Sequence, residues 1–323
     1  MAKKSEPTAF KKTAARTPKL QTAAKPRRLK RPNYQSLKFQ KRIKHPIKLP
    51  NVWSLTKTAG IILWRRRGLF VGITLVYGLL NVVLAQGLSG GTDVAGLKEA
   101  LYNGDFGALW SGLSIFAILV GSAGNSSNGS AAAYQLFLAL IASLAIIWAL
   151  RQAVGGSVIR IRDAYYRGMQ PLIPFVLILL VIGLQLIPLV IGSTIYGTVV
   201  NSGTAVLLVE KLVWALLYAA LALLSLYMLS SSLFTLYIVT LPDMTPMKAL
   251  RSARGLVRHR RWTVLRKILC LPVILLVIAA VIMVPVIILL TPLAQWIFFL
   301  LTMFALTAVH TYMYTLYREL LND

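Results

Sequence analysis

The sequence predicts an all-α integral membrane protein with six transmembrane helices. Of its 323 residues, 57% are hydrophobic, yet the formal net charge is +26. A soluble domain is usually only about 45–50% apolar. The apolar residues fall into long runs that match the thickness of a bilayer, while the charges lie in the first 50 residues and between the runs. This segregation is typical of a membrane protein with a basic tail.

Residues 1–50 are predicted to be a disordered basic tail, and residues 51–323 a six-helix transmembrane domain. The tail is rich in Lys, Arg, Pro and Ala and has few apolar residues, so it cannot bury enough surface to fold alone. It has no apolar core of a secretory signal. Anionic lipid, a ribosome, nucleic acid and another membrane subunit are its candidate partners. The alternative is a solvated tail that only sets topology.

Six apolar runs are long enough to span a membrane. They cover about residues 68–88, 132–150, 171–196, 205–240, 264–290 and 297–317. Residues 108–121 are apolar but too short, which suggests a re-entrant or interfacial segment. Basic segments alternate with neutral or acidic ones at every crossing, so we expect both termini in the cytoplasm and the protein in the inner (plasma) membrane.

The spans also show a weak internal repeat. Basic, partly amphipathic segments precede each pair of spans, at residues 51–67, 151–170 and 243–267. The sequence LQLIPLVIG around Pro188 resembles VIMVPVIIL around Pro285. These observations predict three helical hairpins, each preceded by a basic amphipathic segment. The alternative is a chance likeness between apolar runs of similar composition.

The segment 243–267 is predicted to be a helix on the inner face of the membrane. Thr245 suits the helix cap and Pro246 the first helical position. One apolar stripe contains Met247, Leu250, Ala253 and Val257. A basic stripe beside it, followed by an aromatic residue, contains Arg251, Arg254, Arg258, Arg261 and Trp262. This stripe is predicted to contact anionic lipid or an anionic partner, unless its arginines only fix topology.

The sequence has no motif for a nucleotide, a metal or an activated nucleophile, so we expect no cofactor and no enzymatic activity. One intramembrane polar stripe on the sixth span contains Thr307, His310, Thr311, Tyr314 and Arg318. Together with Ser225 and Ser232 of the fourth span, it is a candidate polar cleft for a headgroup or small anion. The alternative is a set of hydrogen bonds between helices.

Part of the basic segment resembles a known pattern. Pro246, Ala249, Leu250 and Arg251, followed by Leu256, Trp262 and Leu265, resemble the loop before a span in bacterial six-span membrane families. These families are related to the membrane domain of glycerophosphodiester phosphodiesterases. Their pattern has a serine three residues after the leucine, where this chain has Ala253 beside Ser252. The resemblance implies a lipid-associated helical bundle, and no phosphodiesterase activity because no catalytic domain is attached.

Two functions remain after this reading. The first is a non-enzymatic scaffold or accessory protein that engages anionic lipid or a cytoplasmic anionic partner through basic surfaces. The second is a small transporter or lipid carrier with its polar cleft between the fourth and sixth spans.

Overall fold

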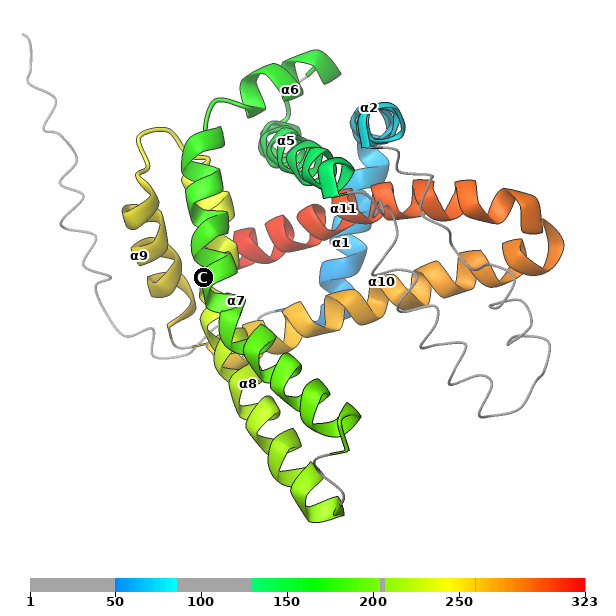
Figure 1. The fold of residues 1–323 in the computed structure, drawn as a ribbon. Coiled ribbons are helices and arrows are strands. Elements are labelled where there is room, and N and C mark those ends of the chain that lie inside the picture. Colours follow the sequence, from blue (N-terminus) through cyan, green and yellow to red (C-terminus); the bar gives the residue numbers. More distant parts are fainter. Residues whose placement is uncertain (1–49, 86–128, 158, 204–206, 259, 323) are drawn as a thin grey trace, which may run out of the picture. The chain divides into compact units, whose positions relative to one another are not determined.

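The computed structural model describes residues 50–85, 129–157, 159–203, 207–258 and 260–322, which form α-helices joined by turns (Figure 1). Six of these helices are long and apolar enough to cross a membrane. They are α2 (Arg67–Ala85), α5 (Gly129–Val154), α7 (Leu172–Asn201), α8 (Leu208–Val239), α10 (Arg261–Leu289) and α11 (Thr291–Asn322). Three shorter helices are α1 (Val52–Arg65), α6 (Ile161–Gly168) and α9 (Pro246–Val257). The predicted fold class, an all-α protein with six membrane-spanning helices, is confirmed.

The predicted spans differ from the helices mainly at their ends. The sixth span was expected over residues 297–317, whereas α11 runs from Thr291 to Asn322. Apolar runs mark only the part of a helix that fits the hydrocarbon layer, and the helix continues beyond it into polar sequence. Residues 1–49 of the predicted tail, and the segment 108–121, lie outside the described residues.

Two glycines end long helices. Gly156 has φ +81° after α5, and Gly203 has φ +70° after α7. This left-handed conformation is readily adopted only by glycine. It lets the Ser157 amide donate to the Gln152 carbonyl at 3.2 Å, which satisfies a carbonyl in the last turn of α5.

The predicted helix over 243–267 is interrupted. α9 ends at Val257 and α10 begins at Arg261, so the basic stripe is divided between two helices. Arg258 follows α9, while Arg261 and Trp262 lie in the first turn of α10. The break lets α9 pack against α8 while α10 runs separately along α11. Pro246 is at the start of α9 as predicted, but the Thr245 side chain makes no capping hydrogen bond.

The helices follow a cyclic order of packing. Consecutive long helices pair as predicted, α2 with α5, α7 with α8, and α10 with α11. A short helix precedes each of these pairs in the chain. It packs on the second long helix of the preceding pair. Thus α6 packs on α5 and α9 packs on α8. The first helix, α1, packs on the last, α11, which is again the second long helix of a pair (Figure 1).

The short helix α6 is fixed from two sides. The hydroxyl of Tyr165 donates to the Ile73 carbonyl of α2 at 2.9 Å. Burial raises the pKa of Tyr165, so the hydroxyl keeps its proton at neutral pH. On the other side, a Cβ added to Gly168 would lie 3.0 Å from the Ala145 Cα and 3.1 Å from the Leu144 carbonyl oxygen. The absence of a side chain at Gly168 therefore permits the close approach of α6 to α5.

We expect Gly168→Ala to lower the unfolding temperature in detergent, because the new methyl group meets backbone that cannot turn aside. Overpacking of this kind costs about 1–3 kcal/mol. Gly255→Ala on α9 is the matched control, since nothing lies within 4 Å of a Cβ there. The control should be neutral or should gain about 0.5–1 kcal/mol of helix stability. Thermal unfolding followed by circular dichroism checks both, and equal behaviour of the two variants would contradict the packing described.

Candidate functional site

The outer side of α9 presents a basic surface. Arg251, Arg254 and Arg258 are exposed. The opposite side of the helix is buried against the bundle, with Ala253 and Val257 fully covered. Of the predicted apolar stripe, only Met247 is exposed, at 76%. The apolar stripe therefore packs mainly on α8, and the arginines are the side chains that α9 exposes to its surroundings.

The remaining two residues of the predicted basic stripe have different roles. The Arg261 guanidinium lies over the ring of Tyr227 in α8, 4.5 Å from its centroid. This cation–π contact fastens the start of α10 to the bundle. Trp262 is 68% exposed. A tryptophan in that position suits the headgroup level of a membrane.

Aromatic and cationic side chains are also exposed on α1. Trp53 and Trp64 are 78% and 74% exposed, and the Arg67 guanidinium lies 5.5 Å from the Trp64 ring centroid. The buried face of α1 contains Leu55 and Ala59. Lys57 and Arg65 of α1 are exposed as well, so this helix displays both aromatic and basic side chains.

The polar stripe of the sixth span faces the protein interior. The Thr307 hydroxyl is 2.9 Å from the Thr74 hydroxyl of α2. The Thr311 hydroxyl donates to the Thr307 carbonyl at 2.7 Å. His310 Nδ1 is 3.1 Å from the hydroxyl of Tyr237 in α8. These groups are engaged within the protein, while Arg318 at the end of the stripe is exposed.

The two serines of the predicted cleft make hydrogen bonds elsewhere. Ser225 accepts the backbone N–H of Leu189 in α7 at 3.1 Å. Leu189 follows Pro188, which lies inside α7 and has no backbone N–H to donate, and in a membrane a neighbouring serine commonly compensates for the disturbed backbone groups. Ser232 donates to the Met228 carbonyl of its own helix at 3.3 Å. Neither serine is hydrogen bonded to α11.

A polar hub joins the ends of the three second long helices. Its members come from the last turns of α5 and α8 and from α11, and they are Arg151, Tyr237, Thr240, His310, Tyr314 and Tyr317. The Arg151 guanidinium donates to the Thr240 carbonyl at 2.8 Å, to the Thr240 hydroxyl at 2.5 Å and to the Tyr237 carbonyl at 3.3 Å. It thus satisfies carbonyls that the end of α8 leaves without helical partners.

Aromatic rings complete the polar hub. The Tyr237 ring lies 6.0 Å from that of Tyr317 in a stacked arrangement and 6.2 Å from that of Tyr314. Such pairs stabilise a core beyond their burial alone. The sequence predicted a polar site at Tyr314 and His310 but not at Arg151 or Tyr237. Arg151 begins the basic segment 151–170, and Tyr237 lies within an apolar run that gives no sign of its partners.

No group of His, Cys, Asp or Glu side chains that could hold a metal ion occurs in the described ranges. The single cysteine, Cys270, is half-buried in α10. Comparison of the chain with protein-family models, curated proteins and solved structures gave no match. The function of the protein is therefore inferred from the residues of this chain alone.

We expect Arg151→Ala to destabilise the protein, because the Thr240 carbonyl loses its donor and the Tyr237 carbonyl keeps only the Thr240 hydroxyl. Hydrogen bonds to charged groups contribute about 1.5–3 kcal/mol each. Arg151→Lys should restore only part of the loss, since an ammonium group cannot reproduce the planar fork. Arg167→Ala, an exposed position on α6, is the control and should change stability by no more than about 0.5 kcal/mol. Denaturation in detergent measures all three, and an Arg151→Ala protein as stable as the control would contradict the role given to the polar hub.

Proposed function

We propose that this multi-pass membrane protein is a non-enzymatic scaffold or accessory protein whose basic surface on α9 engages anionic lipid. The observation that carries the proposal is the exposure of Arg251, Arg254 and Arg258 on a helix whose apolar face is already packed on α8. The cations are therefore held in fixed positions by the fold. A cytoplasmic anionic partner is the alternative ligand for the same surface.

The positive charges on α9 are sufficient to attract an anionic membrane surface. Each Lys or Arg close to an anionic leaflet contributes about 1 kcal/mol. The attraction falls off within a Debye length of about 8 Å at physiological salt. Within the described residues no ion pair joins Arg251 or Arg254 to a carboxylate, so their charges are available to a ligand.

The family resemblance supports the same proposal. Its apolar residues Ala249, Leu250 and Leu265 are buried in the bundle. Its Arg251 and Trp262 are exposed. In this interpretation the motif combines the packing of a surface helix with the display of groups that suit a lipid headgroup.

We further propose that the basic short helices lie on the cytoplasmic side of the inner (plasma) membrane, with both termini there. The sequence between α7 and α8, residues 202–207, has no charged residue, whereas α1, α6 and α9 all contain cations. This distribution supports the orientation by the positive-inside rule.

The transporter alternative receives less support. It requires polar groups that are open to a substrate between α8 and α11. Thr307, His310 and Thr311 are instead hydrogen bonded to neighbouring protein groups.

We expect Arg251→Gln/Arg254→Gln to bind phosphatidylglycerol about thirtyfold more weakly at low salt, if each cation contributes about 1 kcal/mol. Native mass spectrometry of the full chain titrated with this lipid measures the affinity. Lys211→Gln is the control, because Lys211 lies about 40 Å along α8 from the end next to α9. Unchanged lipid binding with loss of a co-purified acidic protein would favour the partner alternative. Unchanged binding of both would contradict the proposed function.

The orientation is tested by single cysteines in a Cys270→Ser background. Asn201→Cys, at the end of α7, should react with a membrane-impermeant maleimide added to intact cells. Arg254→Cys, on α9, should react only after the membrane is permeabilised. The reverse pattern would place the basic surface on the outer side.

A further inference from the structure

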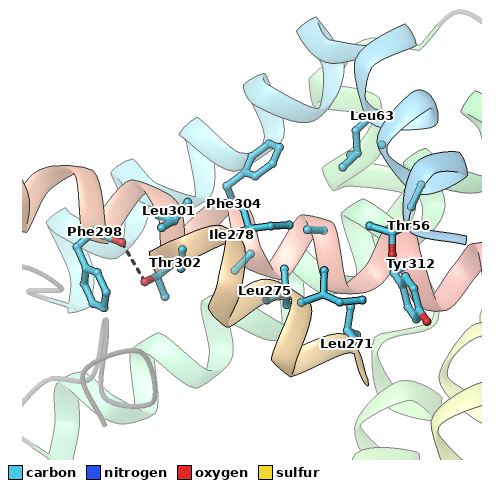
Figure 2. Close-up of a pocket in the computed structure, with 16 residues that line it drawn as sticks. Thr56, Leu63, Leu271, Leu275, Ile278, Phe298, Leu301, Thr302, Phe304 and Tyr312 are labelled. Atoms are coloured by element: carbon cyan, nitrogen blue, oxygen red, sulfur yellow. Dashed lines mark hydrogen bonds between the residues drawn. The ribbon is translucent and has the colours of Figure 1, made fainter. Parts of the chain in front are cut away.

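A cavity of about 300 Å³ lies between α1, α10 and α11 (Figure 2). It is separate from the basic surface of α9 and from the polar hub. Sixteen residues line it, among them Ala59 and Leu63 of α1, Leu275 of α10, and Ala305 and Ala308 of α11. No charged residue is among them. Its volume is at the lower end of the range of about 300–1,000 Å³ for ligand sites.

The few polar groups of the lining already have partners. The Thr56 hydroxyl donates to the Val52 carbonyl at 3.0 Å, and the Thr302 hydroxyl to the Phe298 carbonyl at 3.0 Å. The Tyr312 hydroxyl donates to the Lys267 carbonyl at 3.2 Å. A polar ligand would find the protons of these hydroxyls already donated and would lose its own hydrogen bonds to water. The cavity therefore suits an apolar chain.

The cavity is elongated. Its lining extends along α11 from Phe298 to Tyr312, as Figure 2 shows. The rise of an α-helix gives this stretch a length of about 21 Å. On α10 the lining runs from Leu271 to Ala279, about 12 Å. A slot that follows two membrane-spanning helices has the shape and direction of an extended acyl chain.

Cations lie beside the lining residues on α1 and before them on α10. Lys57 is exposed next to the lining residue Thr56, and Arg266 is exposed five residues before Leu271. The other end of the slot, near Phe298, is formed from apolar sequence. A phospholipid with its phosphate near these cations and one chain in the slot would match this distribution of charge.

The cyclic packing gives an internal comparison. Each short helix packs on one pair of long helices. For α6 and α9 this packing is close. Gly168 brings α6 against the backbone of α5, and Ala249 and Ala253 of α9 are completely buried. A cavity of this kind lies beneath α1. The lining residues Gly60, Ile278 and Phe304 are exposed, so the cavity opens to the surroundings.

We propose that the slot between α1, α10 and α11 binds one acyl chain of a membrane phospholipid whose phosphate lies near Lys57 and Arg266. Bulk lipid is as apolar as the slot, so transfer of the chain brings no hydrophobic gain. Binding is favoured because the chain supplies contacts that the lining side chains would otherwise lack. The site is independent of the arginines of α9.

The test uses the full chain reconstituted in vesicles of phosphatidylcholine with phosphatidylglycerol whose acyl chain carries a photoactivatable diazirine. After irradiation, mass spectrometry maps the crosslinked residues. Crosslinks should be enriched at Leu275 and Ala305 over Leu216, a 74% exposed residue of α8 that reports ordinary contact with bulk lipid. Equal labelling of Leu216 and the slot would overturn the proposal.

A slot-filling variant sharpens the result. Gly60→Leu places a side chain where nothing lies within 4 Å of the Cβ, and it should abolish the crosslinks in the slot. Gly255→Leu, an exposed glycine of α9 with the same open surroundings, should leave them unchanged. Ala305→Met fills the slot from α11 and replaces Gly60→Leu if that variant does not fold. Slot crosslinks that persist in a folded filling variant would also overturn the proposal. Arg251→Gln/Arg254→Gln should keep these crosslinks, which separates this site from the basic surface.

Discussion

The rest of the architecture depends on one junction, the hydrogen bonds from Arg151 to the end of α8. The last carbonyls of a helix have no donor within that helix, so another group must satisfy them. Arg151 reaches them from α5, while the Tyr237 side chain of the same turn contacts His310 and two tyrosines of α11. One turn of α8 thereby joins the second long helices of all three pairs. Once these helices are joined, the positions of the short helices that pack on them are largely decided.

The six spans could be predicted because their signal is local. Length and apolarity in one run of sequence are enough to indicate a helix that crosses a bilayer. The partners of polar residues could not be predicted, because they lie far away in the chain. Thr74 and Thr307 are 233 residues apart, and no pattern near either one indicates the other. The break between α9 and α10 was missed for a related reason, since helical spacing continues across it while the change of packing partner, from α8 to α11, belongs to the tertiary structure.

The three short helices each precede a pair of long helices in the chain, but their interfaces with the long helices differ. Gly168 and two alanines of α9 let their helices lie directly on the long ones. Beneath α1 a volume of about 300 Å³ remains. Because this space is open to the surroundings, a ligand can supply the contacts that a more closely packed helix would have made.

The packing of α1 on α11 also has a consequence for biosynthesis. A ribosome makes α1 long before α11, so α1 lacks the helix on which it mainly packs until α11 has been made. The first pair of spans, α2 and α5, can enter the membrane early. The preceding helix, α1, cannot pack on α11 until more than two hundred further residues have been made. Premature termination before α11 would therefore leave α1 without the helix on which it mainly packs.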